Sequence, residues 1–380
     1  MRLMITSFAA ISLIIGDIAP AAPQNTPARA AIMIDLTSGT ILLEKNADEP
    51  LPPASMSKLM TLNMVFEALE TGRLALGDQF RTSTRASKMG GSKMFLRDGE
   101  LVSVEDMLRG VVIQSGNDAA VALGEALMGT EEAFAAQMNK RAEAIGLTNS
   151  TFANSTGWPD PKQRMSARDI ATLSIRLIEE FPDHYPLFAE TDFTWDGIAQ
   201  RNRNPLLELG IGADGLKTGH TQEAGYGLAA SAKRGDRRVV LVVAGLESTA
   251  QRRQEAERLI NWAFRAFEAK TIYKAGDPLA TARVWIGSSS TVPLVPERDV
   301  TVLYPAGTFD QTELSVRYDA PITAPIEAGA RLGAIEVIAS GMTPVSIPLV
   351  ASHAVAEGGF LSRLEAAASL MMKQILPGEG

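Results

Sequence analysis

The order of strand-like and helix-like segments in the first 270 residues is the feature that most constrains the fold. Two apolar, β-prone runs at 31–36 and 40–43 flank a Ser38-Gly39 turn, and strand-like texture returns at 213–247. Helical apolar spacing fills the middle and closes the segment, over residues 55–71, 103–112, 117–127, 131–145, 166–180 and 250–268. Strands at both ends of a helical middle predict an α+β domain over residues 28–270, in which one sheet gathers strands from both ends.

The pattern of predicted secondary structure changes after this domain. From about residue 275 it consists of short β runs separated by turns, which predicts a small all-β domain over residues 275–351. Residues 358–377 then carry an amphipathic helical pattern with a single apolar stripe. This helix is too short and too charged to span a bilayer, so it is expected to lie at a membrane interface. The alternative is that its apolar face packs on the β domain.

The first 21 residues have the layout of a secretory signal peptide. Arg2 precedes the apolar run LMITSFAAISLII, and Ala19-Pro20-Ala21 offers small residues for cleavage. The alternatives are a buried N-terminal helix or a membrane anchor, but the run is shorter than the roughly 20 residues that a spanning helix needs. An exported protein is therefore expected.

Composition excludes several classes of function. The chain has no cysteine and three histidines, so disulfides, thiolate nucleophiles and cysteine or histidine-rich metal centres are not expected. A net charge of −8 argues against a nucleic-acid partner, which would usually meet a basic face. The 46% hydrophobic and 21% charged content is that of a globular protein with a core. No metal and no cofactor are predicted.

A serine and a lysine three residues apart follow a pair of prolines, Pro52-Pro53. Pro52-Pro53 is compatible with a helix that starts directly after it, and a spacing of three puts Ser55 and Lys58 on one helix face. A desolvated lysine can take the proton of a serine near neutral pH. Taken alone, the pair is more simply a helix-capping serine beside an exposed lysine.

Two further motifs change that balance, Ser115-Gly116-Asn117 and Lys217-Thr218-Gly219. With Ser55-x-x-Lys58, each of the three motifs occurs once, in the order used by penicilloyl serine transferases. Singly, the second motif is typical of a helix cap and the third of a turn. Together they predict a serine acyl-transfer site.

Five of the six positions in the two motifs have a chemical use. Ser115 can relay a proton between Lys58 and the leaving nitrogen, and Asn117 can hold a substrate amide. Lys217 adds positive potential near the oxyanion. The third motif further supplies Thr218, which can bind a carboxylate, and Gly219, which lets a substrate backbone approach the strand edge.

Longer segments around these motifs resemble the D-alanyl-D-alanine carboxypeptidases, the low-molecular-mass penicillin-binding proteins. They are PPASMSKLMT, SKMFLRDGELVSVEDMLRGVVIQSGNDAAVAL, ADGLKTGHTQEAGYGLAASA, TFANSTGWPDPKQRMSARDIATLS and QRRQEAERLINWAF. The resemblance implies a β-lactamase-like catalytic domain, with an antiparallel sheet and an all-helical lobe, followed by an accessory β domain and a membrane-anchor helix. The departures are minor: Trp158 stands where a smaller apolar residue is usual, and Gly227 follows the tyrosine of the third motif.

The resemblance also implies roles for individual residues. Ser55 would be the acylated nucleophile and Lys58 its base, with the backbone N–H groups of Ser55 and His220 forming the oxyanion hole. An arginine after the third motif would bind the substrate carboxylate, and the R-x-x-E-A spacing favours Arg252 over Arg253. Peptidoglycan stem peptides ending in D-Ala-D-Ala would be the substrates, and β-lactams covalent inhibitors. The enzyme would be periplasmic, attached through its tail helix to lipid of the inner membrane.

Three alternatives remain at this stage. A DD-endopeptidase acting on crosslinked muropeptides would carry the same motifs. A serine β-lactamase would need a group that activates water for deacylation, and no segment between residues 150 and 200 resembles the glutamate element of one such class. A non-catalytic wall-binding scaffold would not need all of these polar positions intact.

Overall fold

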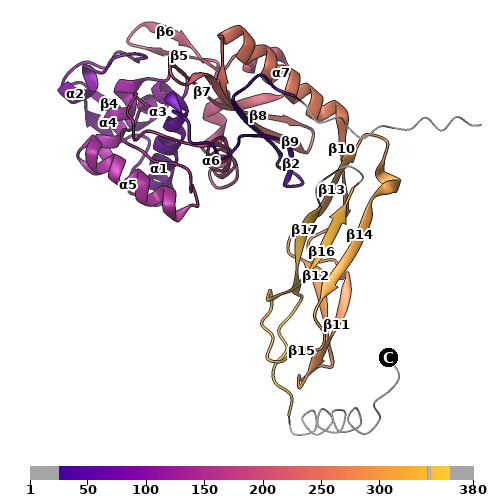
Figure 1. The fold of residues 1–380 in the computed structure, drawn as a ribbon. Coiled ribbons are helices and arrows are strands. Elements are labelled where there is room, and N and C mark those ends of the chain that lie inside the picture. The colour runs from indigo at the N-terminus through magenta and orange to yellow at the C-terminus, as the bar shows by residue number, and fades with distance from the viewer. Residues whose placement is uncertain (1–24, 340–341, 343, 360–380) are drawn as a thin grey trace, which may run out of the picture.

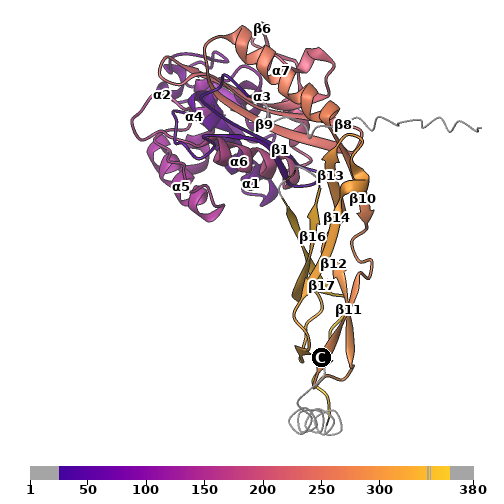
Figure 2. The same ribbon diagram turned by 45° about the vertical axis from the view of Figure 1, so that its right-hand side comes forward.

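The computed structural model describes residues 25–339, 342 and 344–359, which form a domain of helices and sheet and an elongated β domain (Figure 1). The β domain extends away from the first domain like an arm, and Figure 2 shows the same arrangement from a second direction. The predicted signal peptide and nearly all of the predicted tail helix lie outside the described residues. Within the described part of the chain, no helix is both long and apolar enough to cross a membrane.

A five-stranded antiparallel sheet, in the order β2-β1-β9-β8-β7, forms the centre of the first domain. Its strands come from both ends of the segment, as predicted: β1 Ala30–Asp35, β2 Thr40–Lys45, β7 Ala213–Thr221, β8 Gly225–Arg234 and β9 Arg237–Leu246. The central strand β9 reads RRVVLVVAGL because both of its faces are buried, and such strands are apolar in succession and not in alternation.

Helices cover both faces of this sheet (Figure 2). Val240 and Val242 of β9 pack with α1 (Lys58–Glu70) and α6 (Ala167–Glu179) on one side. Leu241 and Val243 point to the other side and pack against α7 (Thr249–Ala266). The α+β class predicted for this domain is therefore confirmed.

A helical lobe lies beyond α1 and holds α2 (Thr84–Ser87), α3 (Val104–Val112), α4 (Asn117–Met128) and α5 (Glu131–Ala144). Side-chain caps fix several of its helix starts, since the Ser103 and Thr130 hydroxyls accept hydrogen bonds from the backbone N–H groups of Asp106 and Ala133. Short pieces that the sequence did not suggest complete the domain: β3 Gln79–Arg81, β4 Leu101–Ser103, β5 Asp192–Trp195, β6 Ile198–Arg201, and the 3₁₀ turns η2 Tyr185–Ala189 and η3 Leu207–Leu209.

The helix predicted over 55–71 is not continuous. Residues Ala54–Ser57 form a 3₁₀ turn, η1, and the α-helix begins only at Lys58. Ala54 has a positive φ of 50°, so the chain enters η1 through a bend that an α-helix could not contain. Ser55 therefore precedes α1 and does not lie in its first turn.

The β domain contains two sheets that share one apolar core. Strands β10 (Phe267–Tyr273) and β13 (Val300–Pro305) pair with each other. The second sheet has the order β14-β16-β17-β12-β11-β15, made of β11 Ala280–Trp285, β12 Thr291–Pro296, β14 Glu313–Tyr318, β15 Ile322–Thr323, β16 Arg331–Ile338 and β17 Val345–Ala351, with η4 Phe309–Gln311 before β14. Because β10 starts directly where α7 ends, the two domains are joined without a linker.

Candidate active site

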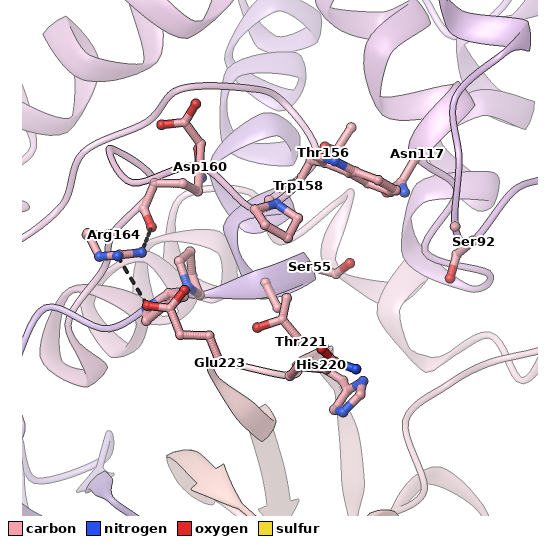
Figure 3. Close-up of a pocket in the computed structure, with 18 residues that line it drawn as sticks. Ser55, Ser92, Asn117, Thr156, Trp158, Asp160, Arg164, His220, Thr221 and Glu223 are labelled. Carbon is pink, nitrogen blue, oxygen red and sulfur yellow. Dashed lines mark hydrogen bonds and ion pairs between the residues drawn. The ribbon is translucent and has the colours of Figure 1, made fainter.

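A cavity of about 540 Å³ opens between the helical lobe and the end of β7 (Figure 3). Figure 3 shows Ser55 near its middle, Asn117 and Ser92 on one side, and Arg164 and Glu223 on the other. Its lining comes from segments far apart in sequence: Pro52–Ser55, Gly91, Ser92, Asn117, Thr156–Asp160, Gln163, Arg164 and His220–Glu223.

Ser55 stands on η1, which is held tightly from two sides. A Cβ on Gly157 would lie 1.9 Å from the carbonyl oxygen of Ala54, and one on Gly219 would lie 2.7 Å from that of Pro53. Both distances are far shorter than real Cβ contacts, so only glycine allows these backbones to approach η1. The nucleophile candidate is thereby fixed between the 154–158 turn and strand β7.

Lys58 is fully buried, and its ammonium group is surrounded by oxygen acceptors. Nζ lies 3.0 Å from Oγ of Ser55, 2.7 Å from Oδ1 of Asn117 and 2.7 Å from the carbonyl oxygen of Thr156. Burial lowers the pKa of Lys58 to about 7, while the nearby charge of Asp118 raises it and that of Arg203 lowers it further. The first two sequence motifs therefore meet at one lysine that can lose its proton near neutral pH.

The second motif forms the entrance to α4. Asn117 donates its side-chain N–H to the carbonyl oxygen of Gly90, which turns its Oδ1 toward Lys58. The buried carboxylate of Asp118 accepts backbone N–H groups of Met94, Phe95, Leu96 and Ala119 and so fixes the loop opposite. Ser115 adopts φ 62°, and its buried hydroxyl has no hydrogen-bond partner among the described residues.

The third motif lies along β7. Lys217 is only 1% exposed, and burial, followed by the charges of Lys58, Arg203 and Arg252, lowers its pKa well below the usual value. His220 lines the cavity, whereas Lys217, Thr218 and Gly219 precede it along the strand and pack beside η1. This cluster of basic residues, in which the charges of Arg203 and Arg252 lower the pKa of Lys217, is suited to receive an anion.

The structure distinguishes the two arginines that the sequence left open. Arg252 is 8% exposed, and its guanidinium lies 5.8 Å from the ring centroid of Tyr226, which in turn stacks on His220 at 3.9 Å. Arg253 is exposed on the next face of α7. Arg252 is thus the arginine that the structure places beside the third motif.

Several residues of this site escaped the sequence reasoning. The positive charge of Arg203 lowers the pKa values of Lys58, Lys217 and Arg252, yet nothing in the segment QRNRN indicates that Arg203 belongs to the site. Asn154 organises the turn that carries Thr156, since its Oδ1 accepts the backbone N–H groups of Thr156, Gly157 and Trp158. The N-x-x-G pattern of an Asx turn at Asn154 was a usable signal.

No group of three or more histidine, cysteine, aspartate or glutamate side chains placed to hold a metal ion occurs among the residues that the structure describes.

Comparison with known proteins agrees with this geometry. The profile of the family described as D-alanyl-D-alanine carboxypeptidase matches residues 17–248, and that of the penicillin-binding protein 5 C-terminal domain matches residues 267–357. D-alanyl-D-alanine carboxypeptidase DacC of Escherichia coli strain K12 is 40% identical over 348 residues, covering 90% of this chain and 87% of the relative. The chain belongs to the D-alanyl-D-alanine carboxypeptidase family.

Solved structures support the same assignment. Penicillin-binding protein 5 from Haemophilus influenzae superposes with a TM-score of 0.83 at 35% identity, covering 88% of this carboxypeptidase-family chain and 99% of that chain. Penicillin-binding protein D2 from Listeria monocytogenes in the ampicillin-bound form gives a TM-score of 0.58 at 30% identity, covering 63% of this chain and 98% of that chain. The predicted enzyme class, a serine-type D-Ala-D-Ala carboxypeptidase, and the predicted catalytic-plus-β architecture are confirmed at the level of this family.

Proposed function

We propose that this enzyme removes the terminal D-alanine from peptidoglycan stem peptides ending in D-Ala-D-Ala, through an acyl-enzyme on Ser55. The contact between Nζ of Lys58 and Oγ of Ser55, 3.0 Å long, carries this proposal, because the same lysine has a pKa lowered to about 7. In its neutral form Nζ keeps two N–H groups for Asn117 and Thr156 and turns its lone pair to the serine hydroxyl.

The reaction has an acylation step and a hydrolysis step. In acylation, Oγ of Ser55 attacks the carbonyl carbon between the two D-alanines, and its proton passes to Nζ of Lys58. The C–N bond breaks, and the leaving nitrogen receives that proton through Ser115, whose buried hydroxyl has no other partner among the described residues. Free D-alanine departs. Water next attacks the ester carbonyl, Lys58 takes a proton from it, and Ser55 regains its hydroxyl as the shortened stem leaves.

The cationic side of the site would bind the charges that appear on the substrate. The backbone N–H groups of Ser55 and His220 are suited to the oxyanion, since Gly219 brings β7 against η1. Lys217, Thr218 and Arg252 would hold the terminal carboxylate, whose negative charge raises the pKa of Lys217 and keeps that lysine charged. Asn117 would orient the acyl-side amide.

We also propose that β-lactams acylate Ser55, because the amide bond of a β-lactam occupies the place of the D-Ala-D-Ala bond. The similarity to a penicillin-binding protein solved with ampicillin supports this.

We propose further that the enzyme is periplasmic and attached to the outer face of the inner membrane. The signal-like start of the chain supports export to the periplasm, and the amphipathic tail supports the membrane attachment.

Covalent labelling by a fluorescent penicillin tests the proposal. The wild-type protein should take the label and release D-alanine from a D-Ala-D-Ala peptide, and Ser55→Ala should do neither. Ser57→Ala is the matched control, since Ser57 lies two residues away on the same 3₁₀ turn and is fully buried. Label retained by the Ser55 variant would place the nucleophile elsewhere.

A further inference from the structure

Trp158 is a large apolar side chain that is 47% exposed at the wall of the cavity. It follows the turn that supplies the Thr156 carbonyl to Lys58, and it replaces a smaller residue expected from the family resemblance. A half-exposed tryptophan beside a reacting serine raises the question of what it holds in place.

The backbone of Trp158 is fixed to the turn of residues 154–158. Its N–H donates to Oδ1 of Asn154 at 3.0 Å and to Oγ1 of Thr156 at 3.1 Å, and its carbonyl oxygen accepts from Nδ2 of Asn154 at 3.0 Å. Because Gly157 of the same turn abuts the Ala54 carbonyl, this turn cannot move without moving η1. The indole therefore projects from a rigid base.

The indole ring rests on a second turn, made of two glycines from the helical lobe. A Cβ on Gly90 would lie 3.0 Å from Cη2 of Trp158, and one on Gly91 would lie 3.2 Å from Cζ3. Gly91 has a φ of 75°, and neither glycine has a side chain of its own to fix the turn. This turn and the next residue hold Asn117, because the Gly90 and Ser92 carbonyl oxygens accept its side-chain and backbone N–H groups at 2.7 Å.

The two turns contact each other through Trp158, and each one orients a hydrogen-bond acceptor of Lys58. The turn of residues 154–158 provides one acceptor for Nζ, through Thr156, and the Gly90–Gly91 turn positions the other, through Asn117. Trp158 belongs to the first turn, and its indole lies against Gly90 and Gly91 of the second. Figure 3 shows it on the Asn117 side of the cavity.

We propose that Trp158 is a positioning residue of the acylation reaction, which holds the two turns that orient the acceptors of Lys58. This inference rests on the proposed roles of Ser55 and Lys58. Removing the indole leaves the Gly90–Gly91 turn without its packing partner, so Asn117 and Lys58 lose their fixed orientation toward Ser55. Misplacement of a catalytic group by about 1 Å can cost as much as 10²-fold in rate.

The test measures the second-order rate of acylation with two probes, ampicillin and 6-aminopenicillanic acid, which has no acyl side chain. Trp158→Ala should slow both probes by about tenfold or more, while Trp158→Phe, which keeps a ring on the glycine turn, should stay within about threefold of wild type. Release of D-alanine should show a lower kcat with little change in KM. Leu314→Ala, on the exposed strand β14 of the other domain, is the matched control and should change nothing.

Two results would overturn the inference. Equal acylation rates for Trp158→Ala and wild type would remove any role, and slowing confined to ampicillin would make Trp158 only a wall for the acyl group. Trp158→Leu provides the same comparison if the alanine variant does not fold. Failure of the proposed function itself would look different, because the wild-type protein would then take no label at all.

Discussion

Nζ of Lys58 lies 2.7 Å from Oδ1 of Asn117, although 59 residues separate them in the chain. This contact joins the first two motifs into one unit, since Asn117 is also tied to the Gly90 carbonyl and Lys58 also reaches Ser55. The amide oxygen can accept a hydrogen bond from either the charged or the neutral form of the lysine, so the contact survives the loss of the lysine's charge. It orients the base without fixing its protonation state.

The first prediction concerns pH. Burial places the pKa of Lys58 near 7, so the fraction of neutral lysine, and with it the rate of penicillin acylation, should rise from pH 5 to 8 with a midpoint near 7. Lys58→Arg keeps a positive charge but does not deprotonate in this range, so it should acylate at least about 10²-fold more slowly at every pH. Stopped-flow acylation across that range measures both, and a flat profile for the wild type would contradict the role of Lys58 as base.

The second prediction concerns a substitution that should shift the midpoint of the pH dependence of acylation. The negative charge of Asp118 raises the pKa of Lys58, so Asp118→Asn should lower it and move the acylation midpoint to lower pH. The same variant loses a carboxylate that accepts four backbone N–H groups, and should be destabilised by about 1–3 kcal/mol. Asp106→Asn, at the start of α3, is a control that leaves the midpoint unchanged. A midpoint that moves upward would show that another charge dominates.

Much of this fold followed from patterns that are local in sequence. The strand runs and the three motifs are each readable within about ten residues, which is why the strands of the sheet and the candidate residues Ser55, Lys58 and Asn117 could be named from the sequence. The start of the helix after Pro53 was misplaced, because α1 begins only at Lys58. The missed features depend on contacts between distant segments. The fold brings the charge of Arg203 near Lys58 and Lys217, and the bend at Ala54 lies where the backbones of Gly157 and Gly219 pack against η1. No pattern that is local in sequence indicates either contact.

The third prediction tests the close approach of Gly157 to the Ala54 carbonyl of η1. Gly157→Ala places a Cβ against the Ala54 carbonyl and should cost about 1–3 kcal/mol of overpacking, in addition to about 1 kcal/mol of backbone strain at its φ of 79°. Gly197→Ala is the matched control, because its φ of 76° is similar and nothing lies within 4 Å. Thermal melts should separate the two, and acylation should fall only in the Gly157 variant. Equal melting temperatures would mean that the 154–158 turn yields freely.

The fourth prediction resolves the two arginines of α7. Arg252 packs over Tyr226 beside the cationic cluster and should bind the substrate carboxylate, whereas Arg253 is exposed. Arg252→Ala should therefore reduce kcat/KM for a D-Ala-D-Ala peptide by about 10–10²-fold, as expected for the loss of a charge-assisted hydrogen bond. Arg253→Ala should stay close to wild type. The reverse order of effects would assign the carboxylate to Arg253.

The last prediction concerns the tail, whose residues 360–376 lie outside the described structure. The described chain ends in an ordered contact, because the N–H of Gly358 donates to the Ile286 carbonyl at 2.8 Å and Glu357 bridges to Gly287. A chain shortened after Gly358 keeps these contacts and the whole cavity, so it should fold, take a penicillin label and release D-alanine at the wild-type rate. It should lose binding to vesicles of anionic and zwitterionic lipid, which the full chain should retain in high salt because apolar burial dominates.

Replacing Leu364 and Met371 by serine tests the same contact in a chain of full length, and should also weaken vesicle binding. A shortened chain that still sediments with vesicles would move the membrane contact to the β domain, and one that unfolds would make the tail part of its core.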